Sequence, residues 1–547
     1  MRSPLLLLFM LILTFPLRAG QRLWLVDPLE PLFPDSNNTS HFGTNYKTDF
    51  PTGTTIDVHI LIRVKPSNTF AVSVALSGDT MPLSCLSELR DVPVEQNTGV
   101  DSRTEAFTGQ RNPYVIRRAP FRIYEALEPL TSASFTAKHV FTALRLSIPG
   151  DRFPGPGTYR IAVTVRGETW SEQGEFVATI HPVRVPPLSE GSFFYTNWFN
   201  LSQMEAKQTL FRWTSEWYAM LDRYADLMAH GRQNCIIIPE ELISVVNGKI
   251  TLDEERMAAF VDVFRKHGFR YFESPHLMYR GDADDWGDPE LKVVLTKRRY
   301  GTPEAKRDVD TIISLVRSFT DRHGLKECWL QHISDEPSAV QAACYKEVVR
   351  QVRGLYPDIR IMEAVTDRDT LAGAVDIWCP TIDDFQQNES FFRARRALGE
   401  QVLVYTCLVP GGKWLNRLLD QERLRQVYFG WGAAFYNTSG FLHWGLNQYM
   451  VPDPFEQSVV HHPSPAATAN NFLPAGDSHV IYPGPLSSTR FEAHRIGIED
   501  FELLQMLKKK DAKKAGELIG RIFRSYTDYS TDVNLYRQTR KELLEAL

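Results

Sequence analysis

Two adjacent carboxylates, Asp335 and Glu336, are the residues of this sequence best suited to acid/base chemistry. They lie in the run His332-Ile-Ser-Asp-Glu-Pro337, directly after an apolar stretch and before a proline. Neighbouring residues within a strand point to opposite faces, but at a strand end both side chains can turn toward one cavity. There the carboxyl group with the less favourable surroundings keeps its proton while the other stays ionised. The alternative interpretation is a simple helix start, capped by Asp or Ser and with Pro in its first turn.

The elements expected to position this pair form a β/α barrel. After Gly191, short apolar strands alternate with amphipathic helices, such as 253–267. We predict eight strands, at 193–199, 235–239, 270–274, 328–334, 359–365, 375–379, 402–407 and 440–444. Eight such units over roughly 300 residues correspond to a TIM barrel. An open doubly wound sheet is the alternative, but no Gly-x-Gly-x-x-Gly turn follows the first strand.

The ends of the predicted strands are rich in carboxylates and aromatic rings. Functional residues of a TIM barrel lie at these carboxyl ends. The combination suits a sugar, whose C–H face stacks on a ring while carboxylates do acid/base work. With Asp335 and Glu336 as catalytic residues, we expect the following residues to bind substrate: Asn197, Trp378, Tyr405, Trp444, Asn447 and Tyr449. For the aromatic residues, packing in the core is the alternative.

The seventh predicted strand, 402–407, contains no acidic residue. In the commonest barrel glycosidases this strand is expected to carry the nucleophile, a carboxylate about 5 Å from the acid. A hydrolase without it can use the 2-acetamido group of its own substrate. Asp335 would then stabilise the acetamido nitrogen, and Tyr405 or Tyr449 would donate a hydrogen bond to the acetamido carbonyl.

Two other functions remain open from the residues alone. A conventional retaining glycosidase would pair Glu336 as acid with Glu273 or Glu363 as nucleophile. A glycan-binding surface protein would have no catalysis, and we would expect its acid/base pair to be broken. The pair is intact here, which favours an enzyme.

The remainder of the chain predicts a leader, an N-terminal β domain and a C-terminal helical segment. The apolar run 5–13, which precedes the small residues Ala19 and Gly20, is typical of a signal peptide over residues 1–20. We therefore expect a secreted protein, periplasmic or extracellular. Alternating apolar and polar residues within 21–187 predict antiparallel sheets packed as a β-sandwich. The barrel domain is assigned to 188–500, and the helices of 501–547 are expected to pack on its exterior.

The composition excludes several classes of partner. The 547 residues carry a net charge of −5 without long runs of like charge, which argues against nucleic-acid binding. No segment approaches the roughly 20 apolar residues that a membrane-spanning helix needs. The six cysteines lack metal-binding spacing, so we expect neither a metal nor another cofactor.

Three ordered motifs near the C-terminus carry a family resemblance. They span 441–449, 474–484 and 487–502, and they follow the upstream Ser-Asp-Glu-Pro motif. The region 191–507 thereby resembles glycoside hydrolase family 123 and the wider domain-of-unknown-function family 4091. The resemblance implies an N-terminal β-sandwich, a barrel, and a retaining exo-β-N-acetylgalactosaminidase that acts through an oxazolinium intermediate. It also implies a glycan with a terminal 2-acetamido sugar as partner, with Asp335 as stabiliser and Glu336 as acid/base. Within the third motif, we expect Arg490 and Glu492 to form a buried structural pair.

Overall fold

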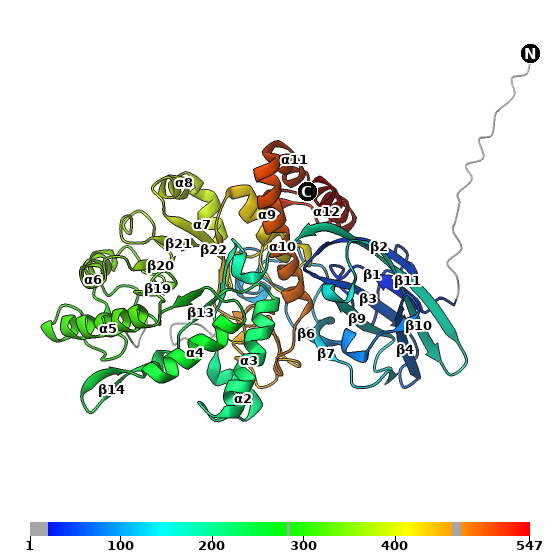
Figure 1. Cartoon of the computed structure of the whole chain (residues 1–547), viewed down its shortest axis with the longest axis horizontal. Coiled ribbons are helices and arrows are strands. Elements are labelled where there is room, and N and C mark those ends of the chain that lie inside the picture. The colour runs from blue at the N-terminus through cyan, green and yellow to red at the C-terminus, as the bar shows by residue number, and fades with distance from the viewer. Residues whose placement is uncertain (1–19, 282–284, 462–471) are drawn as a thin grey trace, which may run out of the picture.

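The computed structural model describes residues 20–281, 285–461 and 472–547, and its centre is a closed barrel (Figure 1). The barrel strands, in order, are β12 (Phe194–Asn197), β13 (Cys235–Ile237), β16 (Tyr271–Glu273), β19 (Trp329–Gln331), β20 (Arg360–Val365), β21 (Ile377–Pro380), β22 (Gln401–Tyr405) and β23 (Gly440–His443). All pair in parallel, and β23 closes the barrel by pairing with β12. The eight predicted strands and the barrel are confirmed, and the open sheet is excluded.

Helices surround the barrel, and most of them bury an apolar side. They are α2 (Leu201–Gln208), α3 (Ser215–His230), α4 (Glu254–Lys266), α5 (Pro303–Arg322), α6 (Ala342–Leu355), α7 (Ile382–Gln387), α8 (Glu389–Ala397) and α9 (Leu424–Tyr436). In α4 the apolar side is buried, with Met257, Phe260, Val261 and Phe264. Asp253 caps the helix by accepting from the Arg256 amide. Thr302 caps α5, which has Pro303 in its first turn.

Short hairpins extend the loops at the carboxyl ends of the barrel strands. Strands β14 (Ile243–Val246) and β15 (Lys249–Leu252) follow β13, and β17 (Met278–Tyr279) and β18 (Lys292–Val293) follow β16. After β23, β24 (Val460–His461) pairs with β25 (Phe472–Leu473). The loops that surround any site at this end are therefore partly held by backbone hydrogen bonds.

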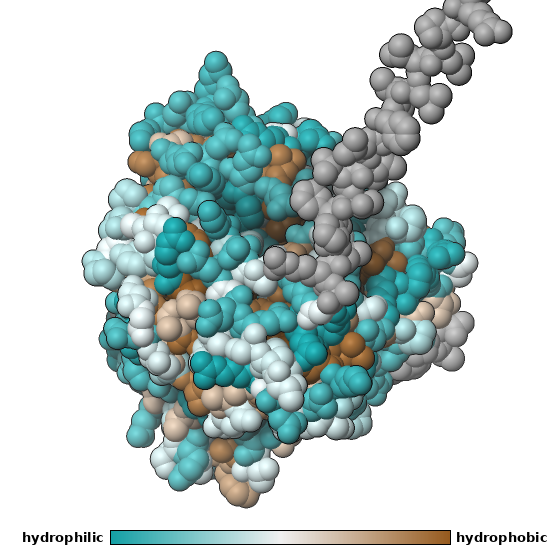
Figure 2. Space-filling model, turned by 90° about the vertical axis from the view of Figure 1, so that its right-hand side faces the viewer, coloured by the Kyte–Doolittle hydropathy of each residue, from teal (hydrophilic) through white to brown (hydrophobic). Residues whose placement is uncertain are grey.

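The residues before the barrel form two β-sheets. One has the order β1 (Leu23–Val26), β3 (Thr55–Arg63), β9 (Phe141–Pro149), β6 (Leu86–Val94) and β7 (Phe121–Pro129). The other has the order β2 (Asn45–Thr52), β11 (Ser171–Arg184), β10 (Gly157–Gly167), β4 (Thr69–Leu76) and β5 (Asp79–Thr80), with β8 (Ser134–Thr136) beside β4. Residues of both sheets, such as Val58 and Val163, share one hydrophobic cluster. Figure 2 shows hydrophilic side chains spread over the face on this side of the molecule, with small apolar areas between them.

The last helices lie between the barrel and the β-rich region (Figure 1). They are α10 (Thr489–Lys510), α11 (Ala512–Ile522) and α12 (Val533–Ala546), and the hairpin β26 (Phe523–Ser525)–β27 (Asp528–Tyr529) precedes α12. Helix α10 runs without interruption through residue 500. It crosses α9 closely, since a Cβ added at Gly430 would lie 1.8 Å from the carbonyl oxygen of Gly497. A Cβ added at Gly497 would in turn lie 2.3 Å from the carbonyl oxygen of Val427, so neither Gly430 nor Gly497 has room for a side chain.

Buried ion pairs join α10 to the N-terminal sheet. Arg490 donates to Glu125 of β7 at 2.6 Å, and Glu492 accepts from Arg145 of β9 at 3.0 Å. The expected Arg490–Glu492 pair is therefore wrong, although both residues are buried as expected. Side chains two positions apart on a helix do not face each other, so each pairs with a different strand. The polar side of β3 is covered in the same way, because Asp57 accepts from Arg495 at 3.2 Å.

The remaining predictions concern the leader, the membrane and the cysteines. Residues 1–19 of the expected signal peptide lie outside the described residues. Within the described ranges, every helix is too short or too polar to cross a membrane. All six cysteines are free thiols.

Candidate active site

A cavity of about 330 Å³ lies at the carboxyl ends of the barrel strands. Both adjacent carboxylates, Asp335 and Glu336, line it together with the half-buried indoles of Trp198 and Trp444 and with Tyr405. The other lining residues are Ala364, Cys407, Leu408, Leu442, Gln448, Met450 and Leu473. The cavity therefore combines flat apolar rings with two acid/base groups, as a sugar site requires.

The backbone at the carboxylate pair leaves the strand in a sharp turn. Glu336 has a φ of 44°, in the left-handed region that a non-glycine residue enters at an energetic cost. The guanidinium of Arg280 holds this turn from outside, since its Nη1 donates to the carbonyl oxygens of Asp335 at 2.6 Å and of Glu336 at 3.1 Å. Helix α6 begins only at Ala342 with Gln341 as its cap residue. The pair is thus not a helix cap.

Tyr405 links the seventh barrel strand to Glu336. Its hydroxyl donates a hydrogen bond to Oε1 of Glu336. Burial, together with the neighbouring Glu336 charge, raises the pKa of Tyr405 well above its usual range. The phenol therefore stays protonated and acts as a donor to Glu336.

A second group of charged residues lies deeper in the barrel. His332 is hydrogen-bonded through Nε2 to Glu273 at 2.8 Å and through Nδ1 to Glu363 at 3.0 Å, and all three side chains are 0% exposed. Although burial opposes a charge on the ring, the bonds to the two glutamates raise the pKa of His332 to about 10. The ring is therefore an imidazolium that bridges two carboxylates.

Further donors satisfy these two glutamates. The indole N–H of Trp198 donates to Glu273 at 3.0 Å, and the hydroxyl of Tyr345 donates to Glu363 at 3.0 Å. The backbone amides of Ile333 and Ser334 also donate to Glu363, at 2.8 and 3.1 Å. Both carboxylates are thus committed to buried hydrogen bonds, and neither lines the cavity.

His276, His332 and Glu363 place their potential ligand atoms within 4.8 Å of one another, a spacing at which a metal ion can bind. Both ring nitrogens of His332, however, are already hydrogen-bonded to carboxylates. A doubly protonated ring has no lone pair for a metal. The donor set therefore fits a hydrogen-bond network better than a metal site.

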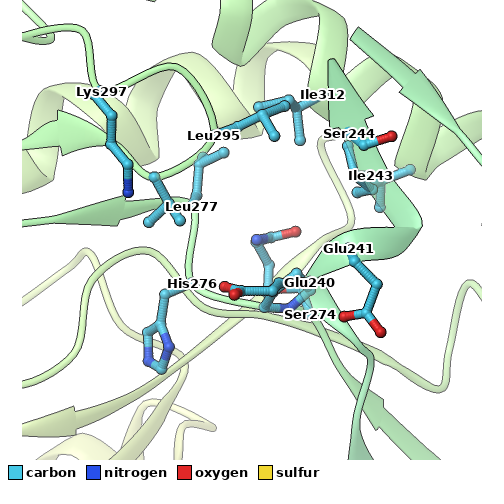
Figure 3. A pocket seen from close by; sticks show the side chains of 14 residues that line it. Glu240, Glu241, Ile243, Ser244, Ser274, His276, Leu277, Leu295, Lys297 and Ile312 are labelled. Carbon is cyan, nitrogen blue, oxygen red and sulfur yellow. The ribbon is translucent and has the colours of Figure 1, made fainter. Parts of the chain in front are cut away.

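A second cavity, of about 350 Å³, lies beside this network on the side of α5 and the β14–β15 hairpin. Figure 3 shows Leu277, Leu295 and Ile312 around it, Glu240 at its lower edge, and the His276 ring turned away from it. The ring packs instead against His332, with 4.6 Å between the ring centroids. His276 therefore borders the second cavity, while its ring packs on His332.

Of the predicted site residues, the structure brings Asp335, Glu336, Tyr405 and Trp444 together in the first cavity. The other four do not line it within the described part of the chain, and each donates a hydrogen bond to a group outside it. Asn197 donates to the Tyr195 hydroxyl at 3.1 Å, Trp378 to Glu400 at 2.6 Å, Asn447 to the Asn200 carbonyl at 3.0 Å, and Tyr449 to the Ile481 carbonyl at 3.1 Å.

Two lining residues missed as candidates are direct neighbours of predicted ones. Trp198 follows Asn197, and Gln448 lies between Asn447 and Tyr449. Since neighbouring residues in extended chain face opposite sides, an error of one position exchanges a cavity residue for a packed one. The large indole directly after the first strand was the available signal for Trp198.

Comparisons with known proteins relate this chain to a glycoside hydrolase family. The family model described as "Glycoside hydrolase 123, catalytic domain" matches residues 198–507. A comparison with curated proteins finds no match. Among solved structures, a family 123 glycoside hydrolase from Clostridium perfringens, described in the context of glycolipid glycan hydrolysis, is 14% identical with a TM-score of 0.71 and covers 96% of this chain and 97% of its own. The endo-β-1,4-mannanase from Thermotoga petrophila is 12% identical over 58% of this chain and 78% of its own, with a TM-score of 0.35.

Proposed function

This chain belongs to glycoside hydrolase family 123, and on that premise we propose that it is a secreted, retaining exo-β-N-acetylgalactosaminidase that uses the 2-acetamido group of its substrate as nucleophile. One observation carries the proposal. Among the described residues that line the cavity, Asp335 and Glu336 are the only carboxylates. Conventional retention needs a separate carboxylate nucleophile about 5 Å from the acid.

The alternative nucleophiles are poorly placed for attack. Glu273 and Glu363 are 0% exposed, and both are hydrogen-bonded to His332. Freeing either would leave a buried imidazolium without one of its carboxylates, which is energetically costly. A nucleophile carried by the substrate removes this need.

In the first step, Glu336 donates its proton to the glycosidic oxygen as the bond from that oxygen to C1 breaks. The acetamido carbonyl oxygen attacks C1 from the opposite face and forms an oxazolinium ion. Asp335 accepts a hydrogen bond from the acetamido N–H and stabilises the positive charge that develops there. Of the two tyrosines considered as donors to the acetamido carbonyl, Tyr405 lines the cavity and Tyr449 does not. The single O–H of Tyr405 donates to Glu336 without substrate, so it would turn to the acetamido carbonyl only once substrate is bound.

In the second step, the Glu336 carboxylate takes a proton from water, and the water oxygen attacks C1 and opens the oxazolinium ring. Two inversions at C1 give net retention, and Glu336 regains its proton. Trp198 and Trp444 are available to stack on the sugar ring. The signal-peptide pattern of residues 1–20 supports secretion.

Glycans of glycolipids are the first natural substrates to examine, since the structurally similar family 123 enzyme was studied for their hydrolysis. The decisive screen compares aryl 2-acetamido-2-deoxy-β-galactoside, its gluco epimer and the plain β-galactoside. We expect fast cleavage of the first, slower cleavage of the second and almost none of the third, with the β-anomer of the sugar released first in NMR spectra. Equal rates on the acetamido and plain galactosides would refute substrate assistance. Glycan binding without turnover would favour a non-catalytic protein.

A further inference from the structure

We propose that His276 is a positioning residue for Asp335: its Nε2–H holds one oxygen of the Asp335 carboxylate and leaves the other for the acetamido N–H. This role rests on the proposed function, because the acetamido group is what the second oxygen would bind. The structural part of the proposal, a hydrogen bond from the ring to Asp335, can be tested without substrate.

The position of the Nε2 atom is the main observation. It lies 4.0 Å from Oδ1 of Asp335 and 3.7 Å from Oε1 of Glu363. It is buried and has no hydrogen-bond partner among the described residues. Since buried polar atoms nearly always have a partner, a working state in which Nε2 gains one is expected.

The two neighbouring atoms also define the tautomer. Both are carboxylate oxygens, which only accept hydrogen bonds when ionised. A lone pair on Nε2 would face the lone pairs of both, so the favourable form of the neutral ring carries its proton on Nε2. The ring is therefore a donor that faces Asp335 and Glu363.

The network described above holds this ring in place. The ring packs on His332, and the indole of Trp198 meets its edge with 5.5 Å between centroids. Glu363 already accepts from His332, Tyr345 and two backbone amides. Asp335 lies at the cavity with its side chain 46% exposed. A shift of about 1 Å of this side chain would bring the pair to hydrogen-bond distance.

The charge state of the ring supports a role in positioning. Burial and the charged His332 lower the pKa of His276 to about 4, and Arg280 acts in the same direction. Glu363 and Glu273 oppose this shift. The ring is thus neutral at pH 7. A neutral donor orients the Asp335 carboxylate and leaves its negative charge intact for the acetamido nitrogen.

Two variants separate a donor from a packing role. In His276→Gln the side-chain amide places an N–H near the position of Nε2, whereas His276→Phe keeps a ring without a donor. On the aryl 2-acetamido galactoside we expect His276→Phe to lower kcat about ten- to a hundredfold with little change in KM, and His276→Gln to keep most of the activity. Equal losses in both variants would contradict the proposal, because packing alone would not favour the amide.

A double-mutant cycle tests the coupling to Asp335. If His276 acts through Asp335, then His276→Phe causes no further loss of kcat in an Asp335→Asn background. Multiplicative losses would overturn the proposal. Activity that is abolished by a chelator and restored by zinc would overturn it too, since His276 would then be a metal ligand.

Nitrogen NMR of the full-length protein, labelled with ¹⁵N-histidine, provides a test that requires no turnover. The His276 signals are identified by their loss in His276→Gln. We expect a neutral ring with the proton on Nε2, and a shift of this signal in Asp335→Asn. A proton on Nδ1, or no response to Asp335→Asn, would contradict the proposal. If wild type cleaves none of the aryl glycosides, the proposed function fails, while these spectra still decide whether His276 contacts Asp335.

Discussion

The hydroxyl of Tyr405 donates a hydrogen bond to the carboxylate of Glu336. Tyr405 is the last residue of β22, the seventh strand of the barrel. A conventional barrel glycosidase is expected to carry its nucleophile on this strand. In this chain Tyr405, which contacts Glu336, therefore lies close to the place where a conventional enzyme would carry its carboxylate nucleophile.

We expect Tyr405→Phe to lower kcat about ten- to a hundredfold, because hydrogen bonds to a charged group contribute roughly 1.5–3 kcal/mol. Steady-state kinetics on the aryl 2-acetamido galactoside measures this effect. Tyr449→Phe is the matched control: it removes the same hydroxyl from a tyrosine that donates to the Ile481 carbonyl instead. Similar losses of kcat in both variants would contradict a specific role for the Tyr405–Glu336 bond.

The dependence of kcat on the leaving group should differ between the Glu336 and the Asp335 variants. Glu336→Gln removes the proton donor, which contributes about 10²–10⁴-fold, but a highly activated aryl leaving group needs no proton. We therefore expect Glu336→Gln to retain much more activity on dinitrophenyl than on alkyl glycosides. Asp335→Asn should be impaired on both, because the acetamido group must attack in either case. The slopes of log kcat against leaving-group pKa test this, and equal slopes for the two variants would contradict the assigned roles.

The buried ion pairs between the β-rich region and the helices should dominate the stability of their contact. Glu125 of β7 pairs with Arg490 at 2.6 Å and with Arg423 at 3.2 Å, and all three are buried. We expect Glu125→Gln to lower the free energy of unfolding by about 3 kcal/mol, since two buried guanidinium groups lose their counter-charge. Urea denaturation measures the change. On the same strand, Glu128 pairs with a partly exposed Arg90 at 2.9 Å, so Glu128→Gln should cost at most about 1 kcal/mol.

The stability of the protein should depend on pH through His332. Its pKa is raised to about 10 in the folded protein, above the roughly 6.5 of an unfolded histidine. The stabilisation is therefore fully present below pH 6.5 and is lost as the pH rises toward 10. We expect the free energy of unfolding to fall more steeply between pH 7 and 10 in wild type than in His332→Gln. Parallel curves would indicate that His332 is neutral in the folded protein.

The barrel and the position of the two adjacent carboxylates at its strand ends could be predicted from local sequence patterns. Short apolar strand runs alternate with helices of period 3.6, and the carboxyl ends of the strands in a TIM barrel lie on one face. These rules correctly place Tyr405 and Trp444 at the cavity. They do not show which of two adjacent residues faces the barrel interior when the strand is buried on both sides. In β21, Cys379 belongs to the cluster inside the barrel, whereas Trp378 packs outside it against the helices.

The buried charges could not be predicted in the same way. Apolar and polar residues alternate along β3 in the same way whether its polar face contacts water or the arginines of another element. Here Asp57 accepts from Arg495 of α10, which lies far along the chain. Glu273, His332 and Glu363 were each visible as charged residues in apolar strands. Their mutual contacts depend on the order of strands in the closed barrel, which no single segment encodes.

The closure of the barrel also has a consequence for how activity arises during synthesis. Trp198 follows the first barrel strand and Trp444 follows the last, and both indoles line the same cavity. The two strands become neighbours only when β23 pairs with β12. While the ribosome is still adding the last third of the barrel, the carboxylates are present but one wall of the cavity is missing. Glycosidase activity should therefore appear only after the whole barrel has left the ribosome, which makes turnover a sensitive indicator of completed folding.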